Sequence, residues 1–256
     1  MTKTLRIAAV SDIHGNLPAL GAVVANIDRK GVDVIINLGD SLSGPLLPQE
    51  TADYLRLQAA HWTHLAGNHE RQILEAPRAA CPDPADLYAR SQLDTDTLAW
   101  IASLTNTYVY AKDIFLCHAS PRRDIEYLLE TVTASGMRIA SAAEITDRLA
   151  GRTEALILCG HTHLPRNVRI GGQLVVNPGS VGLPAFDDER PHFHKVENGA
   201  PDARYAIIER TITGWSASLI AVPYDFEPMA MLAEERGFSD WACALRTGYM
   251  SECADG

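Results

Sequence analysis

The sequence predicts an α/β fold, and three observations lead to this inference. Short apolar runs of strand-like composition alternate with segments in which apolar residues recur at helical spacing. The length of 256 residues, with 46% hydrophobic and 21% charged residues, is typical of a folded globular chain rather than a disordered one. Polar side chains follow the apolar runs, and α/β proteins bind their ligands beyond the carboxyl ends of the strands. We therefore expect a functional site where these strands end.

The expected strands are short apolar runs, each bounded by a polar residue or a glycine. In chain order they cover residues 5–10, 32–38, 62–66, 113–117, 155–159 and 174–176. Each run is too short for a typical helix and is bounded by turn residues, as strands are.

Helices are expected between these strands. Asn16 and Pro18 mark the start of the first helix, in which apolar residues through Ile27 follow the i, i+3, i+4, i+7 pattern. The other predicted helices cover residues 48–57, 94–104, 124–130 and 142–149. The proline-rich residues 76–86 are expected to form a surface excursion.

The chain changes character after Leu183. A polar, irregular segment, a β-hairpin and two short helices are expected there, over residues 186–201, 204–224 and 229–249. We expect the hairpin to lie at the edge of a second sheet and the helices to cover the C-terminal side. On this prediction residues 1–256 form one domain, with a motif-bearing core at about 5–183 and a hairpin and helices at 204–250.

Charge and cysteine content limit the possible partners. The formal net charge is −10, from 22 Lys and Arg against 32 Asp and Glu, so stable binding to a long nucleic acid is not expected. No apolar run approaches the ~20 residues needed to cross a bilayer, so no membrane association is expected. The five cysteines are scattered, without a C-x-x-C pair: Cys81, Cys117, Cys159, Cys243 and Cys253. We therefore predict a reduced, cytoplasmic protein.

Five of the predicted strand ends carry side chains that bind metals in proteins. They are Asp12-Ile13-His14, Gly39-Asp40, Gly67-Asn68-His69, His118 and Gly160-His161-Thr162-His163. Residues two apart on an extended segment point the same way, so Asp12 with His14, and His161 with His163, can face one cavity. Imidazole and carboxylate together suit Mn, Fe, Co, Ni or Zn. The ligands are too many for one four-coordinate ion, which indicates a pair of metals.

Each motif alone has a simpler interpretation. Asp12 can cap the next helix, Gly39-Asp40 is a common turn, and His118 can be a packed histidine at a strand end. The ordered combination of all five at strand ends favours a metal site. The remaining histidines lack this context and are interpreted as surface or packing residues: His61, His64, His192 and His194.

The order of these motifs, continued by Glu70 after His69, resembles the calcineurin-like metallophosphoesterase superfamily over about residues 5–183. Residues 177–182, Asn-Pro-Gly-Ser-Val-Gly, resemble its small prokaryotic phosphodiesterase branch. The resemblance implies a four-layer αββα sandwich with two mixed β-sheets and a dinuclear site. It implies that one metal is held by Asp12, His14 and His163, and the other by Asn68, His118 and His161. Asp40 would bridge both metals, whereas His69 would lie beside them without being a ligand.

These roles predict a metal-dependent phosphoesterase. A hydroxide bridging two divalent transition-metal ions, expected to be Mn with Fe, Ni, Zn or Co as alternatives, would attack phosphorus. His69 is the candidate general acid for the leaving oxygen.

The substrate is expected to be a small phosphodiester. Protein phosphatases that share the motifs carry arginines that are absent here from residues 41–44 and from Ala66. Bidentate arginines suit a phosphomonoester dianion, so their absence favours a diester. Arg122 and Arg123 are candidates for contacting the substrate. The alternatives are a phosphomonoesterase, acting on phosphoproteins or dinucleoside polyphosphates, and a non-catalytic binding scaffold. The retained His69 and the seven apparent ligands argue against the scaffold.

Overall fold

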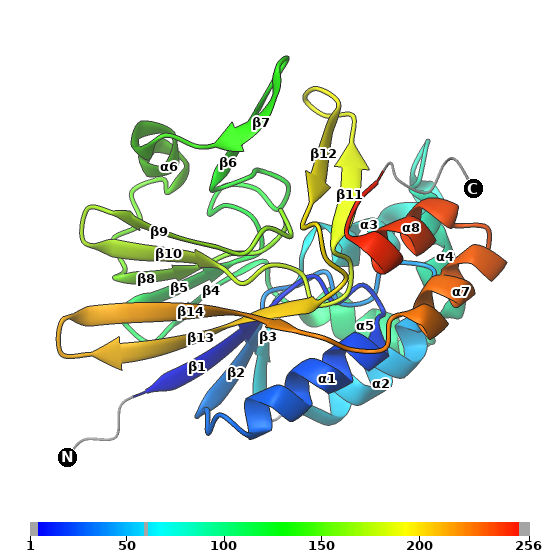
Figure 1. Cartoon of the computed structure of the whole chain (residues 1–256), viewed down its shortest axis with the longest axis horizontal. Helices are drawn as coiled ribbons and strands as arrows, with labels where there is room; N and C mark the ends of the chain where they lie inside the picture. Colours follow the sequence, from blue (N-terminus) through cyan, green and yellow to red (C-terminus); the bar gives the residue numbers. More distant parts are fainter. Residues whose placement is uncertain (1–4, 59–60, 251–256) are drawn as a thin grey trace.

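The computed structural model describes residues 5–58 and 61–250, and its framework is a pair of five-stranded mixed sheets (Figure 1). The first sheet has the order β14-β13-β1-β2-β3. Its strands are β1 (Arg6–Val10), β2 (Val34–Asn37), β3 (Trp62–His64), β13 (Ala203–Thr211) and β14 (Gly214–Val222). The second sheet has the order β4-β5-β8-β10-β9. Its strands are β4 (Thr107–Tyr110), β5 (Ile114–Cys117), β8 (Leu156–Leu158), β9 (Arg166–Ile170) and β10 (Gln173–Asn177).

The two sheets pack face to face because their strands bury side chains on both sides. On β1, Ile7 and Ala9 lie in a core shared with Leu116 and Leu158 of the second sheet. Ala8, between them, faces the helices on the outer side of the first sheet. This alternation follows from the two-residue period of a strand. The predicted four-layer αββα arrangement with two mixed sheets is confirmed.

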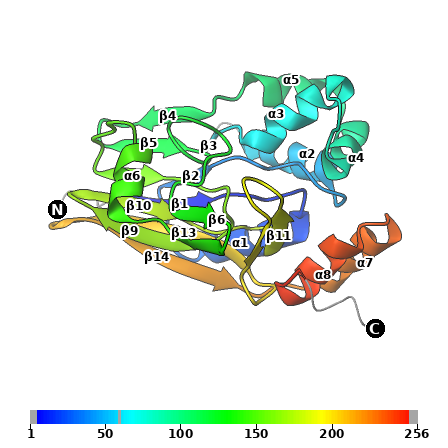
Figure 2. The same ribbon diagram turned by 90° about the horizontal axis from the view of Figure 1, so that it is seen from above.

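Helices cover the outer faces of both sheets (Figure 2). Those that pack on the first sheet are α1 (Leu17–Asp28), α2 (Pro48–Gln58), α3 (Asn68–Glu75), α4 (Pro84–Gln92) and α5 (Thr95–Ser103). The second sheet is covered by α6 (Ala142–Arg148), through Ile145. The side chain of Asn16 accepts a hydrogen bond from the amide of Ala19 at 3.2 Å, which caps α1 as the sequence indicates.

Residues 124–130 do not form the predicted helix. Leu128 and Leu129, which are consecutive, are both buried beneath α6, and the turns and bends of this segment place them there. The amide of Ala140 donates to the carbonyl of Leu129 at 2.9 Å. The chain then continues as a hairpin of β6 (Glu130–Thr133) and β7 (Gly136–Ile139). Tertiary packing therefore overrides the local helical pattern.

The C-terminal hairpin forms as predicted but joins the first sheet rather than the second. Strand β13 pairs antiparallel with β1, with Ala9 opposite Ala206. Ile208 faces the second sheet, whereas Tyr205 packs with the helices, so β13 is buried on both faces and β14 takes the edge. The two short C-terminal helices are present as α7 (Glu227–Glu235) and α8 (Ser239–Thr247).

Two segments predicted to be irregular contain regular structure. The polar segment after Leu183 forms a second small hairpin, β11 (Ala185–Asp188) paired with β12 (His194–Glu197). The proline-rich excursion contains a short 3₁₀ helix, η1 (Ala76–Arg78), and leads into α4, which Asp83 caps by accepting from the amide of Ala85 at 2.7 Å. Proline at the first helical position suits this start.

The cysteines depart from the expected reduced state at one position. Cys81, Cys117 and Cys159 have free thiols. Cys243 on α8 is disulfide-bonded, so the prediction of a fully reduced chain is wrong there. Cys253 lies outside the described residues. Separately, none of the helices in the described part of the chain has the length and apolar character that a membrane span requires.

Candidate metal centre

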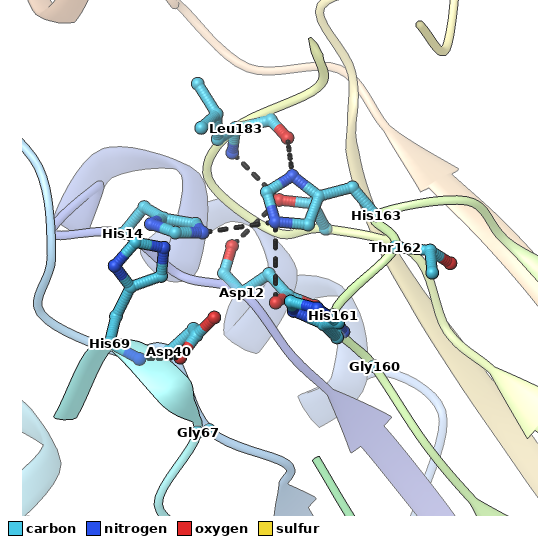
Figure 3. A network of polar contacts seen from close by, with 12 residues as sticks. Asp12, His14, Asp40, Gly67, His69, Gly160, His161, Thr162, His163 and Leu183 are labelled. Atoms are coloured by element: carbon cyan, nitrogen blue, oxygen red, sulfur yellow. Dashed lines mark hydrogen bonds and ion pairs between the residues drawn. The ribbon is translucent and has the colours of Figure 1, made fainter. Parts of the chain in front are cut away.

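The strand ends of both sheets meet at one place. The amide of His14 donates to the carbonyl of Asp40 at 3.0 Å, which joins the loops after β1 and β2. The amide of His161, after β8, donates to the Asp12 carboxylate at 3.2 Å, which joins the second sheet to the first. Figure 3 shows the resulting convergence of side chains. Most of these predicted site residues are buried, whereas His69 and His161 are half-buried. The centre therefore opens to solvent on their side.

The first donor cluster consists of Asp12, His14 and His163, each offering one donor atom within 4.8 Å of the others. The Nε2 atoms of His14 and His163 are 3.1 Å apart. The Nε2 of His163 lies 3.4 Å from Oδ1 of Asp12. Two ring nitrogens and a carboxylate that converge in this way form a candidate metal-binding group.

The second donor cluster consists of Asp40, His118 and His161, again within 4.8 Å of one another. Oδ2 of Asp40 lies 3.0 Å from Nε2 of His118. That nitrogen is 4.0 Å from Oδ1 of Asp12, so the two clusters are neighbours. The resemblance implied that His118 and His161 share this group with Asn68 and that Asp40 lies between the two groups.

The oxygen of the Asn68 side chain adds a fourth donor to the second cluster. It lies 3.1 Å from Nε2 of His118, and the same position is 2.9 Å from Nδ1 of His161 and 3.2 Å from Oδ2 of Asp40. Oxygen beside carboxylate oxygen is repulsive unless a cation lies between them or the amide is rotated. The amide nitrogen is already used, because it donates to Gln72 at 2.9 Å. The present orientation therefore fits a cation held by all four residues.

The backbone is strained at five of the predicted ligands. Left-handed φ values, between 52° and 70°, are found at Asp12, His14, Asp40, His161 and His163. Such values are uncommon for residues other than glycine and concentrate at functional sites. Close approach of the loops also requires glycine at two positions. A Cβ on Gly67 would lie 2.1 Å from the Asp40 carboxylate, and one on Gly160 would lie 1.9 Å from Oγ of Ser11.

Burial keeps two of the candidate ligands neutral. It lowers the pKa of both His14 and His161 to about 3. Burial opposes charge at His118 as well, but Asp40, together with Asp12 and the carbonyl of Leu38, outweighs it and raises the pKa of His118 to about 9. A cation between these groups would replace that proton. Neutral imidazoles beside carboxylates are the form in which these side chains bind metals.

Sequence reasoning missed Asp86, which lies on α4 and pairs with His69. The carboxylate is buried, and its Oδ1 lies 2.9 Å from Nδ1 of His69. Burial acts to lower the pKa of His69, but Asp40 and then Asp86 outweigh it and raise the pKa to about 10. Asp86 comes from the segment expected to be a surface excursion, and no local pattern links it to His69.

Glu70 belongs to a predicted motif but received no role from the sequence. Its buried carboxylate accepts from the amides of Gly67, Asp40 and Ser41 at 2.7, 2.8 and 2.7 Å. These bonds hold the loop after β2 against the start of α3. Glu70 therefore fixes the strained backbone of Asp40.

The two candidate substrate-contacting arginines differ. The guanidinium of Arg122 is held by Glu126 at 2.8 Å and by Asp147 at 3.0 Å. Arg123 is exposed and has no ion-pair partner in the described part of the chain. Both border a cavity of about 400 Å³ that His118 and Ser120 also line. Arg123 is therefore the freer cation beside the second donor cluster.

The histidines left out of the predicted site remain outside both donor clusters. His64 lies between the rings of Trp62 and Trp100, at 5.8 and 5.6 Å. His194 accepts a hydrogen bond from the hydroxyl of Tyr127 through Nε2 at 2.9 Å, because its Nδ1 is used by the carbonyl of His192.

A family model and a solved structure both match most of this chain. The family model described as the calcineurin-like phosphoesterase superfamily domain matches residues 5–198. The fold is similar to the crystal structure of a metallophosphoesterase from Sphaerobacter thermophilus, with a TM-score of 0.75 and 26% identity, covering 96% of this chain and 100% of that one.

Two further similarities involve proteins without a stated activity. The fold of hypothetical protein PH1004 from Pyrococcus horikoshii matches with a TM-score of 0.74 and 17% identity, over 96% of this chain and 100% of that chain. Uncharacterized protein MJ0912 of Methanocaldococcus jannaschii is 25% identical over 251 residues, which cover 89% of this chain and 90% of that protein.

Proposed function

Because the chain belongs to the calcineurin-like phosphoesterase superfamily, we propose that it is a metal-dependent phosphoesterase that hydrolyses phosphodiester bonds of a small substrate. The observation that carries the proposal is the pair of adjacent donor clusters on strained backbone. Strain of this kind persists where the surrounding structure maintains it for a function.

In this proposal the first donor cluster holds one divalent cation. The second donor cluster, with the oxygen of Asn68, holds another, and Asp40 bridges them. The mixture of imidazole, carboxylate and amide oxygen favours Mn, with Fe, Ni, Zn and Co as alternatives. When bound, two such cations supply an activated water and neutralise charge on the phosphoryl oxygens.

His69 would serve as the general acid. Its Nδ1 faces Asp86, which leaves the proton on Nε2 for transfer to the departing oxygen. Asp86 orients the ring, and the amide of His69 donates to Oδ1 of Asp40 at 2.9 Å, which fixes the base of the side chain. His69 is also one of the half-buried members of the centre, so a substrate can reach it. Proton transfer of this kind typically accelerates a reaction by ~10²–10⁴-fold.

A diester preference follows from the shortage of free cations. Arg122 is engaged by two carboxylates, and Arg71, which follows the His69-Glu70 pair on α3, donates to Asp124 at 2.7 Å. Arg123 alone would leave a phosphomonoester dianion without a bidentate pair of arginines. A singly charged diester needs less compensation.

The test uses metal-free protein to which Mn, Ni, Zn or Mg is added. Bis(p-nitrophenyl) phosphate and p-nitrophenyl phosphate are supplied separately, and p-nitrophenolate release is followed. We expect metal-restored turnover that is faster with the diester. Faster turnover of the monoester would indicate a phosphomonoesterase, and the absence of turnover with every metal would indicate a scaffold.

A further inference from the structure

The C-terminal helix α8 reaches the first donor cluster. The ring of Trp241 meets the ring of His14 edge-on, with centroids 5.7 Å apart and planes at 77°. The other rings against His14 are those of His69 and His163, which belong to the centre itself. Trp241 therefore supplies a ring contact on His14 from outside the motifs.

His14 lacks an orienting hydrogen bond that two of the other candidate histidine ligands make. His163 and His118 each direct Nδ1 at a backbone carbonyl, of Leu183 at 2.7 Å and of Leu38 at 2.9 Å. Bonds of this kind orient metal-binding imidazoles. Nδ1 of His14 is buried and has no hydrogen-bond partner among the described residues. Apart from the contact of its Nε2 with His163, packing sets the orientation of this ring.

Trp241 is itself firmly placed. It packs against the apolar cluster that joins Leu46 to α7 and α8, and against the cluster around Leu183 and Ala185. A Cβ on Gly44 would lie 2.5 Å from the indole ring, so the loop after Asp40 is shaped around it. The guanidinium of Arg236 donates to the carbonyl of Pro45 at 2.7 Å and fastens the same helical pair to this loop.

We propose that Trp241 is a positioning residue for the first donor cluster, in which its ring replaces the hydrogen bond that His14 lacks. The proposal rests on the proposed function, because it requires that His14 binds a metal. The second donor cluster has no part in this contact. Changes at Trp241 therefore act on one of the two metal positions.

To test this, metal-free protein is titrated with Mn²⁺ alone. Binding is monitored by calorimetry and by electron paramagnetic resonance. Wild-type protein is expected to bind two ions and to show the spin-coupled signal of a manganese pair. In Trp241→Ala one of the two ions should bind about 10–100-fold more weakly, the usual effect of losing a group that orients a ligand. The coupled signal should then give way to that of an isolated ion at low metal concentration. Trp241→Phe, which retains an aromatic ring, should restore the spin-coupled signal of the manganese pair.

Two further variants separate positioning from general stability. Phe238→Ala removes a ring that packs in the same helical cluster but against Tyr88, at 6.2 Å, and should bind both ions normally. Trp241→Leu keeps apolar volume in the clusters without an aromatic edge, and it replaces the alanine variant if that variant does not fold.

The outcomes distinguish the inference from the proposed function. Two ions of wild-type affinity in the Trp241 variants, or equal weakening in Phe238→Ala, would overturn the positioning role and leave the phosphoesterase proposal intact. Wild-type protein that binds neither Mn²⁺ nor, in parallel titrations, Fe²⁺, Co²⁺, Ni²⁺ or Zn²⁺ would overturn both.

Discussion

The two donor clusters present similar side chains but are supported by different parts of the molecule. The second donor cluster is braced from within the motif-bearing core, by Gln72 on Asn68, by Glu70 on the Asp40 loop and by Leu38 on His118. The first donor cluster is supported by Leu183, at the end of that core, and by the segment that follows it. Leu183 accepts from His163, and Phe186 meets its ring at 4.7 Å.

This difference shows why residues outside a motif can act selectively on a site. Hydrogen bonds from neighbouring loops are tied to the motif segments themselves. Ring contacts from β11 and α8 come from segments whose sequence is free of those motifs. Substitutions in the C-terminal segment should therefore affect one half of the centre, whereas substitutions in the core can affect either half.

The largest effect is expected at Asp40, which is proposed to bridge the metals of the two donor clusters. Asp40→Asn removes the charge proposed to bridge both metals, each worth several kcal/mol in catalysis, so turnover should fall by at least ~10³-fold. Metal titration should show both ions weakened. If only the second position weakened, Asp40 would belong to that half alone.

The next largest effect is expected at His69, which belongs to neither donor cluster. His69→Ala should retain two metals and lose ~10²–10⁴-fold in turnover of an alkyl phosphodiester, whose leaving group needs a proton. The loss should be smaller with p-nitrophenol as the leaving group. Asp86→Asn should show a weaker version of the same pattern. Unchanged alkyl-ester rates would exclude His69 as the acid.

A change in folding stability should show how strongly Glu70 supports the second donor cluster. Glu70→Gln replaces the carboxylate that accepts three buried amide hydrogen bonds with a neutral amide. The weaker bonds should lower the free energy of unfolding by about 3 kcal/mol. Urea unfolding of the metal-free protein measures the change. Glu75→Gln, on the exposed end of the same helix, provides a matched control that should change stability little.

The smallest effect concerns His64, behind the Asp40 loop. Asn37 contacts both Nδ1 of His64, at 3.3 Å, and the hydroxyl of Ser41, at 2.9 Å. Burial lowers the pKa of His64 to about 4 from its usual 6.5. The unfolded chain therefore takes up the proton first, and stability that is complete above pH 6.5 falls as the pH drops from there toward 4.

At pH 5 the lowered pKa of His64 should have reduced the free energy of unfolding by about 2 kcal/mol relative to its value above pH 6.5. The measurement is the pH dependence of urea unfolding in metal-free wild-type protein and in His64→Gln. The difference between the two isolates His64 from the other buried histidines. Equal slopes in both proteins would contradict the prediction.

Local sequence was enough for much of the framework. Short apolar runs with bounding turns predicted β1, β2, β5, β8 and β10, because a strand buried on both faces must be apolar along its length. Ligand residue types at the strand ends predicted which side chains would meet, because parallel strands end at the same edge of a sheet. The bounds of α1 and α2 were close for the same local reason, since capping and proline signals act within one turn.

What the tertiary structure alone decided depends on contacts distant in sequence. The irregular course of residues 124–129 follows from packing under α6, and the pairing of His69 with Asp86 follows from the docking of α4. Trp241 reaches His14 across more than two hundred residues of chain. The sequence by itself determined which residues could bind metal, because ligand chemistry belongs to each side chain. Only the folded chain decided what holds them in place, because orientation depends on neighbours that no local pattern specifies.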